Sequence, residues 1–178
     1  MIILGVDPGS RRTGYGVIAC RGNSFSRIDS GTIMLESFKT LPERLHALHQ
    51  RLDELIREHT PDAFSLETAF YNKNVQSTLK LGHVRGVAML CAAQHGLDIY
   101  EYSPREVKRA VTGNGGAAKQ QIEYMVKNLL AFEGEFAHDD EADGIALALC
   151  HALQGSLPKK SGGDWNSFLA KHPDRIVR

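Results

Sequence analysis

The sequence opens with MIILGVDPGSRRTGYGVIAC, residues 1–20, in which two apolar segments flank one acid, Asp7, and a turn rich in Gly and Arg. IILGVD and TGYGVIAC predict two consecutive strands, because Pro8-Gly9 signals a turn between them. RIDSGTIML predicts a third strand, so the chain starts as an antiparallel meander. This arrangement places Asp7 at the C-terminal end of the first strand, where a lone carboxylate follows a buried segment.

The residues after this meander predict helices that alternate with two further strands. Leu side chains recur with helical period from Thr40, and Thr40 and Glu43 have the spacing of a capping box. The next strand, DAFSLE, can pair parallel to the first strand because a long helix separates the two. There follow a helix over about residues 75–95, a strand LDIYEY, a helix from Ser103 to Gly113, and two helices in KQQIEYMVKNLLA and DDEADGIALALCHAL. This order predicts an α/β fold with a mixed five-stranded sheet and helices packed on both of its faces.

Length and composition indicate one domain. The 178 residues are 42% hydrophobic, which is enough for one substantial core. The segment after the last helix changes to Ser, Gly, Pro and Lys, which predicts a basic C-terminal tail. We therefore expect a domain over residues 1–154 and a tail over residues 155–178, for which a flexible extension is the simplest interpretation.

The charge balance and the cysteines narrow the function classes. Lys plus Arg and Asp plus Glu both number 21, so a nucleic-acid partner has to be recognised through a local basic surface. The three cysteines are far apart and lack CxxC spacing, which argues against a disulfide framework and a structural zinc site. Without a signal sequence or a stretch of transmembrane length, we expect a soluble, cytoplasmic protein with no membrane partner.

Acidic residues from separate segments carry the main functional prediction. Asp7 and Glu67 each end a predicted strand, at the edge where open α/β sheets place ligands, and Asp140 and Asp143 share one face of the first turn of a buried helix. Clustered carboxylates need cations or protons, and oxygen ligands suit Mg²⁺. Two such ions, about 3.5–4 Å apart, would clamp the attacking and leaving oxygens of a phosphodiester.

The same acids also have structural explanations. Asp7 before Pro8-Gly9 is a common turn former, and acids at a helix start favour the helix dipole. Asp139 would share a helix face with Asp143 as well, and His138 is a further neighbour, so the register of the ligands within HDDEAD stays open. The joint pattern favours the metal site, because the four acids have no shared structural purpose.

Basic and aromatic residues lie in segments between the acids. Phe70 follows Glu67 in a polar loop, where it can stack on an exposed base or simply cover the end of the sheet. Basic residues also gather in stretches without acids, which predicts basic surfaces around an acidic centre. A polyanion held beside metal ions fits this arrangement.

These motifs, in this order, resemble the bacterial RuvC family of Holliday-junction resolvases. The match covers Met1 to about Gln154 and is most specific in GVDPGSRRTGYGV, LETAFYNKNVQSTLKLGHVRG, SPREVKRAVTGNGGAAKQQ and DEADGIALALCHA. The resemblance implies an RNase H-like fold and an endodeoxyribonuclease, active in DNA recombination and repair, that resolves four-way junctions by paired symmetric nicks. It also implies Mg²⁺ or Mn²⁺, a homodimer and collaboration with the RuvAB branch-migration motor.

The resemblance also assigns roles to particular residues. By position, Asp7, Glu67, Asp140 and Asp143 resemble the catalytic metal ligands of the family, and Phe70 resembles the aromatic residue that stacks at the opened junction. Three basic residues resemble its DNA contacts: Lys73, Lys108 and Lys119. The helix after the aromatic loop is an expected dimer surface, in which Gly82 and Gly86 would allow close approach or serve ordinary packing within one subunit.

Three other functions compete with junction resolution. An RNase H-like nuclease acting on structured RNA would use the same acids. Actin-like sugar kinases and ATPases also open with an Asp-Gly phosphate loop, but they need a second nucleotide-binding half for which this chain is too short. A non-catalytic junction-binding module would lack one of the acids, and all four are present.

Overall fold

The computed structural model describes residues 1–68 and 74–155. The five strands are β1 (Ile2–Asp7), β2 (Arg12–Arg21), β3 (Ser24–Met34), β4 (Ala63–Glu67) and β5 (Ile99–Tyr102). The helices are α1 (Leu41–His59), α2 (Val75–Gln94), α3 (Pro104–Thr112), α4 (Lys119–Leu129) and α5 (Asp139–Gly155). The predicted tail beyond Gly155 lies outside the described residues, so the division into a domain and a tail stays a prediction.

One mixed sheet organises the chain, in the strand order β3-β2-β1-β4-β5. β1, β2 and β3 form the expected antiparallel meander, whereas β4 pairs parallel to β1 and β5 pairs parallel to β4. Parallel neighbours need long crossovers, which α1 and α2 supply. The predicted fold class is therefore confirmed, with β3 starting three residues earlier than the predicted segment RIDSGTIML.

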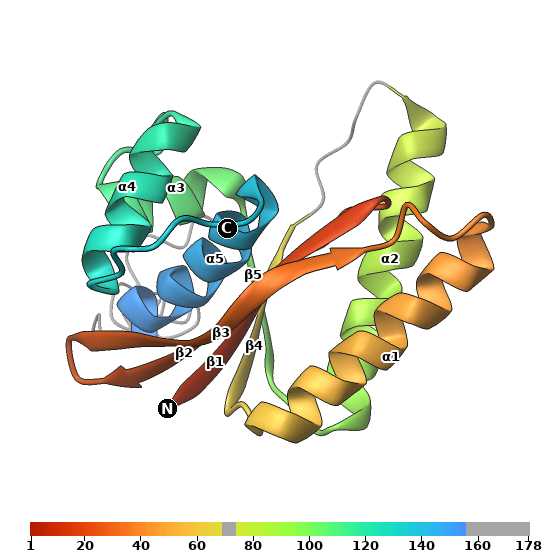
Figure 1. The fold of residues 1–178 in the computed structure, drawn as a ribbon, viewed down its shortest axis with the longest axis horizontal. Coiled ribbons are helices and arrows are strands. Elements are labelled where there is room, and N and C mark those ends of the chain that lie inside the picture. Colours follow the sequence, from red (N-terminus) through yellow and green to blue (C-terminus); the bar gives the residue numbers. More distant parts are fainter. Residues whose placement is uncertain (69–73, 156–178) are drawn as a thin grey trace, which may run out of the picture.

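The helices form two layers, one on each face of the sheet (Figure 1). α1 and α2 cover one face, and α3, α4 and α5 cover the other. Side chains alternate along β1: Ile3 belongs to the core under α5, and Leu4 and Val6 belong to the core under α1 and α2. Neither core forms without the sheet between them.

Local signals in the sequence explain where the helices begin and end. Thr40 and Ser103 cap α1 and α3 through complete capping boxes, with Pro at the first helical positions. Gly113 ends α3 in a left-handed conformation, as expected for a glycine at this position. Among the described residues, no helix is both long and apolar enough to cross a membrane.

Candidate active site

Two strand ends bring Asp7 and Glu67 side by side. β1 and β4 are paired in parallel up to Val6 and Leu66, so the next residue of each strand is an acid. Strand alternation decides the face: Ile3 of β1 belongs to the core under α5, and two residues before Glu67, the Ser65 hydroxyl donates to the Leu147 carbonyl of α5 at 2.8 Å. Asp7 and Glu67 are in register with these residues and therefore lie on the α5 side.

α5 brings the other two acids to this edge. Its first turn contains Asp140 and Asp143, and the helix continues as a buried apolar segment against the sheet. β2 approaches this turn so closely that a Cβ on Gly14 would lie 1.7 Å from the Asp140 carbonyl oxygen. A Cβ on Gly144 would likewise lie 2.5 Å from the Tyr15 Cα. The absence of side chains at both positions therefore sets the height of the acids above the sheet.

The acids form a carboxylate cluster. Carboxylate oxygens of Asp7, Asp140 and Asp143 all lie within 4.8 Å of one another. Glu67 lines a pocket of about 200 Å³ together with Asp7, Asp143 and Lys108. All four predicted acids thus meet at one edge of the sheet, and the structure includes Asp140 in the cluster, whereas the Asp139 side chain is 77% exposed.

Burial and mutual repulsion make the cluster costly when it is fully ionised. Burial, followed by the negative charges of Glu67 and Asp143, raises the pKa of Asp7 well above its ordinary value. Burial also raises the pKa of Glu67, against the hydrogen bond from Asp7 and the positive charges of Arg85 and Lys108. The pKa of Asp143 is raised by burial too, with Lys119 opposing the shift. The site therefore holds protons or requires added positive charge.

Of the three lysines predicted to contact DNA, Lys108 and Lys119 lie within the described residues, and both border this cluster. The Lys119 ammonium lies 3.1 Å from a carboxylate oxygen of Asp143 and 3.5 Å from one of Asp139, so it is an ion-pair partner of the site. Lys108 lines the pocket itself. Phe70 and Lys73, predicted to contact DNA, lie outside the described residues.

Two supporting residues escaped the sequence analysis. Arg85 of α2 donates to the Glu67 carbonyl and pairs with the Glu101 carboxylate, and so ties the end of β4 to β5. Glu141 resembles a helix-dipole acid in the sequence, but its side chain is buried and accepts from Arg27 at 3.2 Å and from the Ser30 hydroxyl at 2.6 Å. Glu141 thus fixes the start of α5 to β3, through a contact 111 residues apart that no local signal announces.

Comparison with known proteins identifies the family. The sequence model of "Crossover junction endodeoxyribonuclease RuvC" matches residues 3–151. The protein of this name from Prosthecochloris aestuarii is 40% identical to this chain, over 99% of this chain and 100% of that protein. The protein of this name from Alkaliphilus metalliredigens is 48% identical, over 87% of this chain and 94% of that protein.

Solved structures agree. The fold is similar to Thermus thermophilus RuvC in complex with a Holliday junction substrate, with a TM-score of 0.83 and 28% identity over 88% of this chain and 96% of that one. It is also similar to another T. thermophilus RuvC structure, with a TM-score of 0.80, 28% identity, and coverage of 87% and 95%. With the carboxylate cluster at the expected edge of an RNase H-like sheet, these matches show that the chain belongs to the RuvC family of crossover junction endodeoxyribonucleases.

Proposed function

We propose that this chain is a metal-dependent endonuclease that resolves four-way DNA junctions by paired symmetric nicks, in recombination and repair. The observation that carries the proposal is the half-buried carboxylate cluster of Asp7, Glu67, Asp140 and Asp143, in a chain of this family. The solved structure of T. thermophilus RuvC with a Holliday junction substrate supports the choice of DNA structure.

The donor set fits a hard divalent cation. The raised pKa values of Asp7, Glu67 and Asp143 express an excess of negative charge in a buried place, which Mg²⁺ or Mn²⁺ would neutralise through oxygen ligands. We propose that these acids and Asp140 hold two such ions. When bound, the ions supply a water of lowered pKa as nucleophile and stabilise the leaving 3′ oxygen, without a covalent enzyme intermediate.

The residues of the chain itself position the scissile phosphate. Lys108, in the wall of the pocket, is placed to contact a phosphate oxygen. Lys119 pairs with Asp143, and we propose that it exchanges this partner for the DNA backbone when positive charge enters the cluster. From the resemblance alone, we extend the DNA-contacting role to Phe70, as a base-stacking residue, and to Lys73.

We propose that two copies assemble through α2. Leu79 and Leu90 are 60% and 55% exposed and flank an apolar groove of about 460 Å³ that includes Gly82 and Gly86. Within the described residues, no atom outside the local backbone of α2 lies within 4 Å of a Cβ built on either glycine, so packing among these residues does not explain them. A second copy would cover this groove and supply the second active site for paired nicks. Collaboration with RuvAB remains a prediction from the resemblance, and a cytoplasmic location remains a prediction from the sequence.

The carboxylate cluster is tested by Asp7→Asn in single-turnover cleavage of a synthetic four-way junction, a matched duplex and a structured RNA, each with Mg²⁺ or EDTA. We expect the wild type to nick only the junction, symmetrically and with Mg²⁺. Asp7→Asn should slow cleavage by more than about 100-fold, because even outer partners of metal ligands cost 10–100-fold, and should leave junction binding intact or stronger.

Asp98→Asn is the matched control, because Asp98 is an exposed carboxylate just before β5, at the opposite end of the sheet. This variant should cleave like the wild type. Normal cleavage by Asp7→Asn would rule out the proposed site, and wild-type cleavage of RNA alone would transfer the function to the RNA-directed nuclease.

A further inference from the structure

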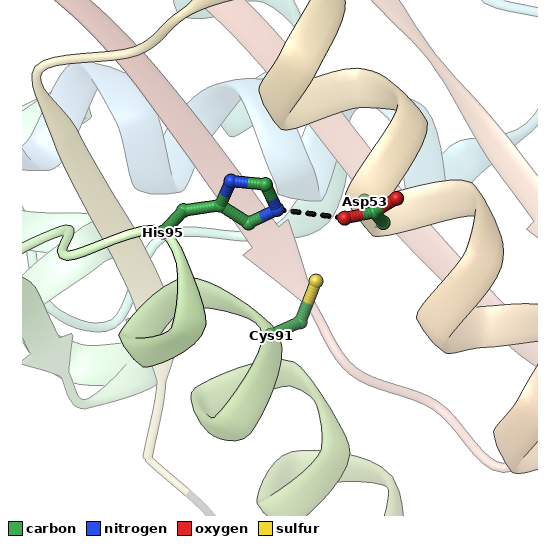
Figure 2. A group of neighbouring side chains, drawn as sticks. All are labelled: Asp53, Cys91 and His95. Atoms are coloured by element: carbon green, nitrogen blue, oxygen red, sulfur yellow. Dashed lines mark hydrogen bonds and ion pairs between the residues drawn. The ribbon is translucent and has the colours of Figure 1, made fainter.

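A second cluster of donor side chains lies on the other face of the sheet, between α1 and α2. A carboxylate oxygen of Asp53, the Sγ of Cys91 and a ring nitrogen of His95 all lie within 4.8 Å of one another. Figure 2 shows the three side chains converging from the two helices, with the sulfur of Cys91 directed toward the gap between the other two. The proposed nuclease mechanism uses none of them.

The spacing of these residues along the chain places their donor atoms on the facing sides of α1 and α2. Cys91 and His95 are four residues apart at the end of α2, so they share a helix face, and His49 precedes Asp53 by the same interval on α1. The two faces meet: the Cys91 thiol is 3.9 Å from the His49 carbonyl oxygen, and the His49 ring is 2.9 Å from the Gln94 side chain. Pairs of ligands one helical turn apart are a common way for helices to hold a metal ion.

The three donor atoms are close enough for one metal ion to bind all of them after small movements. His95 Nε2 and Asp53 Oδ1 are 2.7 Å apart, as in a hydrogen bond. Ligand atoms around tetrahedral zinc lie about 3.3–3.6 Å apart, given zinc–ligand bonds of about 2.0–2.3 Å. His95 and Asp53 would therefore separate by less than about 1 Å, which small side-chain rotations achieve.

The surroundings also suit a bound ion. The Cys91 side chain is fully buried, whereas the side chains of His95 and Asp53 are 24% and 25% exposed, which leaves an entry path from solvent. Arg57 binds the second carboxylate oxygen of Asp53 at 3.1 Å and so orients the oxygen that faces His95. A thiol and an imidazole select a softer ion than the Mg²⁺ of the carboxylate cluster.

We propose that Asp53, Cys91 and His95 form a zinc site that cross-links α1 to α2, with the fourth position taken by water. On binding, the Cys91 thiol releases its proton to solvent, His95 Nε2 gives up the proton that it donates to Asp53 and the neutral ring keeps its proton on Nδ1, and the hydrogen bond between His95 and Asp53 is replaced by two bonds to the ion. The site is structural: it stabilises the helical layer on the face of the sheet opposite the carboxylate cluster.

Co²⁺ titration of the metal-free full chain tests the proposal, because only a cobalt–thiolate bond gives an intense near-ultraviolet charge-transfer band. We expect the wild type to develop this band to saturation at one equivalent, and Zn²⁺ to abolish it and to raise the Tm. Asp7→Asn should keep the band, because oxygen ligands do not produce it. Cys20→Ser, which removes a thiol outside the cluster, should keep it as well.

Three variants decide the outcome. Cys91→Ser should lose the band, and His95→Gln and Asp53→Asn should weaken Co²⁺ binding by more than about 10-fold, since each removes a ligand. His95→Gln preserves a donor to Asp53 at a partly exposed position, so it decides the matter if Cys91→Ser does not fold. A wild type without the band, or a His95→Gln variant that binds Co²⁺ like the wild type, would overturn the zinc site and leave these residues as a helix–helix hydrogen-bond clamp.

Discussion

Asp7 has a pKa well above its ordinary value in the candidate active site. Its carboxyl is held on the α5 side of the sheet end by strand alternation, where Glu67, Asp140 and Asp143 surround it. Burial and these neighbours favour its protonated form, so the folded chain without metal holds a proton there more tightly than the unfolded chain does. The same property that prepares the site for divalent ions therefore destabilises the metal-free protein.

Because ionised Asp7 destabilises the metal-free fold, we predict that Asp7→Asn gains stability when metal is absent. Because the folded pKa of Asp7 is raised, its contribution to stability is complete below the unfolded value of about 4 and is lost as the pH rises through the folded value. In EDTA at neutral pH, Asp7→Asn should raise the Tm by several degrees, and the gain should shrink toward pH ~4.

Thermal unfolding followed by circular dichroism across this range checks the prediction. With Mg²⁺, the wild type should gain stability through ligand binding and the variant should gain less. Equal Tm values for both proteins in EDTA at neutral pH would contradict the raised pKa.

α5 is the element whose position matters most, because it carries two acids on its first turn and closes one core along its length. Two features fix its start: the side-chain-free contact at Gly14, and the buried Glu141 carboxylate, whose second oxygen accepts from the Ala137 backbone N–H at 3.0 Å. Neither contact involves a carboxylate group of the cluster, yet both decide where Asp140 and Asp143 stand relative to Asp7.

Gly14→Ala is therefore expected to reduce both stability and activity. The new methyl group would meet the Asp140 carbonyl oxygen at 1.7 Å, which forces the first turn of α5 away from β2. We expect a loss of about 1–3 kcal/mol in the free energy of unfolding, as for other overpacked sites. Junction cleavage should fall by at least about 100-fold, since displacements near 1 Å have that effect in active sites.

Denaturant unfolding and single-turnover cleavage at saturating Mg²⁺ measure the two effects. Gly116→Ala is the control, because its Cβ would meet only the Asn114 side chain, at an ordinary 3.5 Å. Cleavage at the wild-type rate by Gly14→Ala would show that the height of α5 is not critical.

At the scale of the whole molecule, one helical layer borders the candidate active site and the other carries the proposed dimer surface. α5, with α3 and α4, places acids and lysines around the carboxylate cluster, whereas α1 and α2 form the second core and, among the residues that the structure describes, leave the apolar groove on α2 exposed. Arg85 of α2 contacts both Glu67 and Glu101, so the expected dimer helix is physically linked to the strand ends that carry the site.

Leu79→Glu should dissociate the proposed dimer, because it places a charge in an interface that is lined mainly by apolar side chains. Sedimentation should then report a monomer at concentrations where the wild type is dimeric. On a plasmid with an extruded cruciform, paired nicks give linear product and single nicks give open circles, so the variant should shift the product to open circles.

Ile28→Glu is the matched control, since Ile28 is also a large apolar residue, 44% exposed, but lies on β3. It should remain dimeric and yield linear product. A dimeric Leu79→Glu would mean that the groove on α2 is not the interface.

The sequence by itself determined the elements and three acids of the carboxylate cluster, Asp7, Glu67 and Asp143. Strand alternation, capping boxes at Thr40 and Ser103 and the helix stop at Gly113 are local effects, so the elements follow from neighbouring residues. The parallel pairing of β1 and β4 follows from the α1 crossover, and it was enough to predict that Asp7 and Glu67 meet.

Only the tertiary structure decided which neighbours act together across long separations. Asp140 rather than Asp139 joins the cluster because α5 approaches β2 at one angle, set by contacts with Gly14 and Gly144. The cluster of Asp53, Cys91 and His95 has no local sequence signature such as CxxC, because its donors come from two helices that meet only in the folded protein. Such contacts depend on how whole elements dock, and the free energy of docking is spread over both cores rather than encoded in any one stretch of sequence.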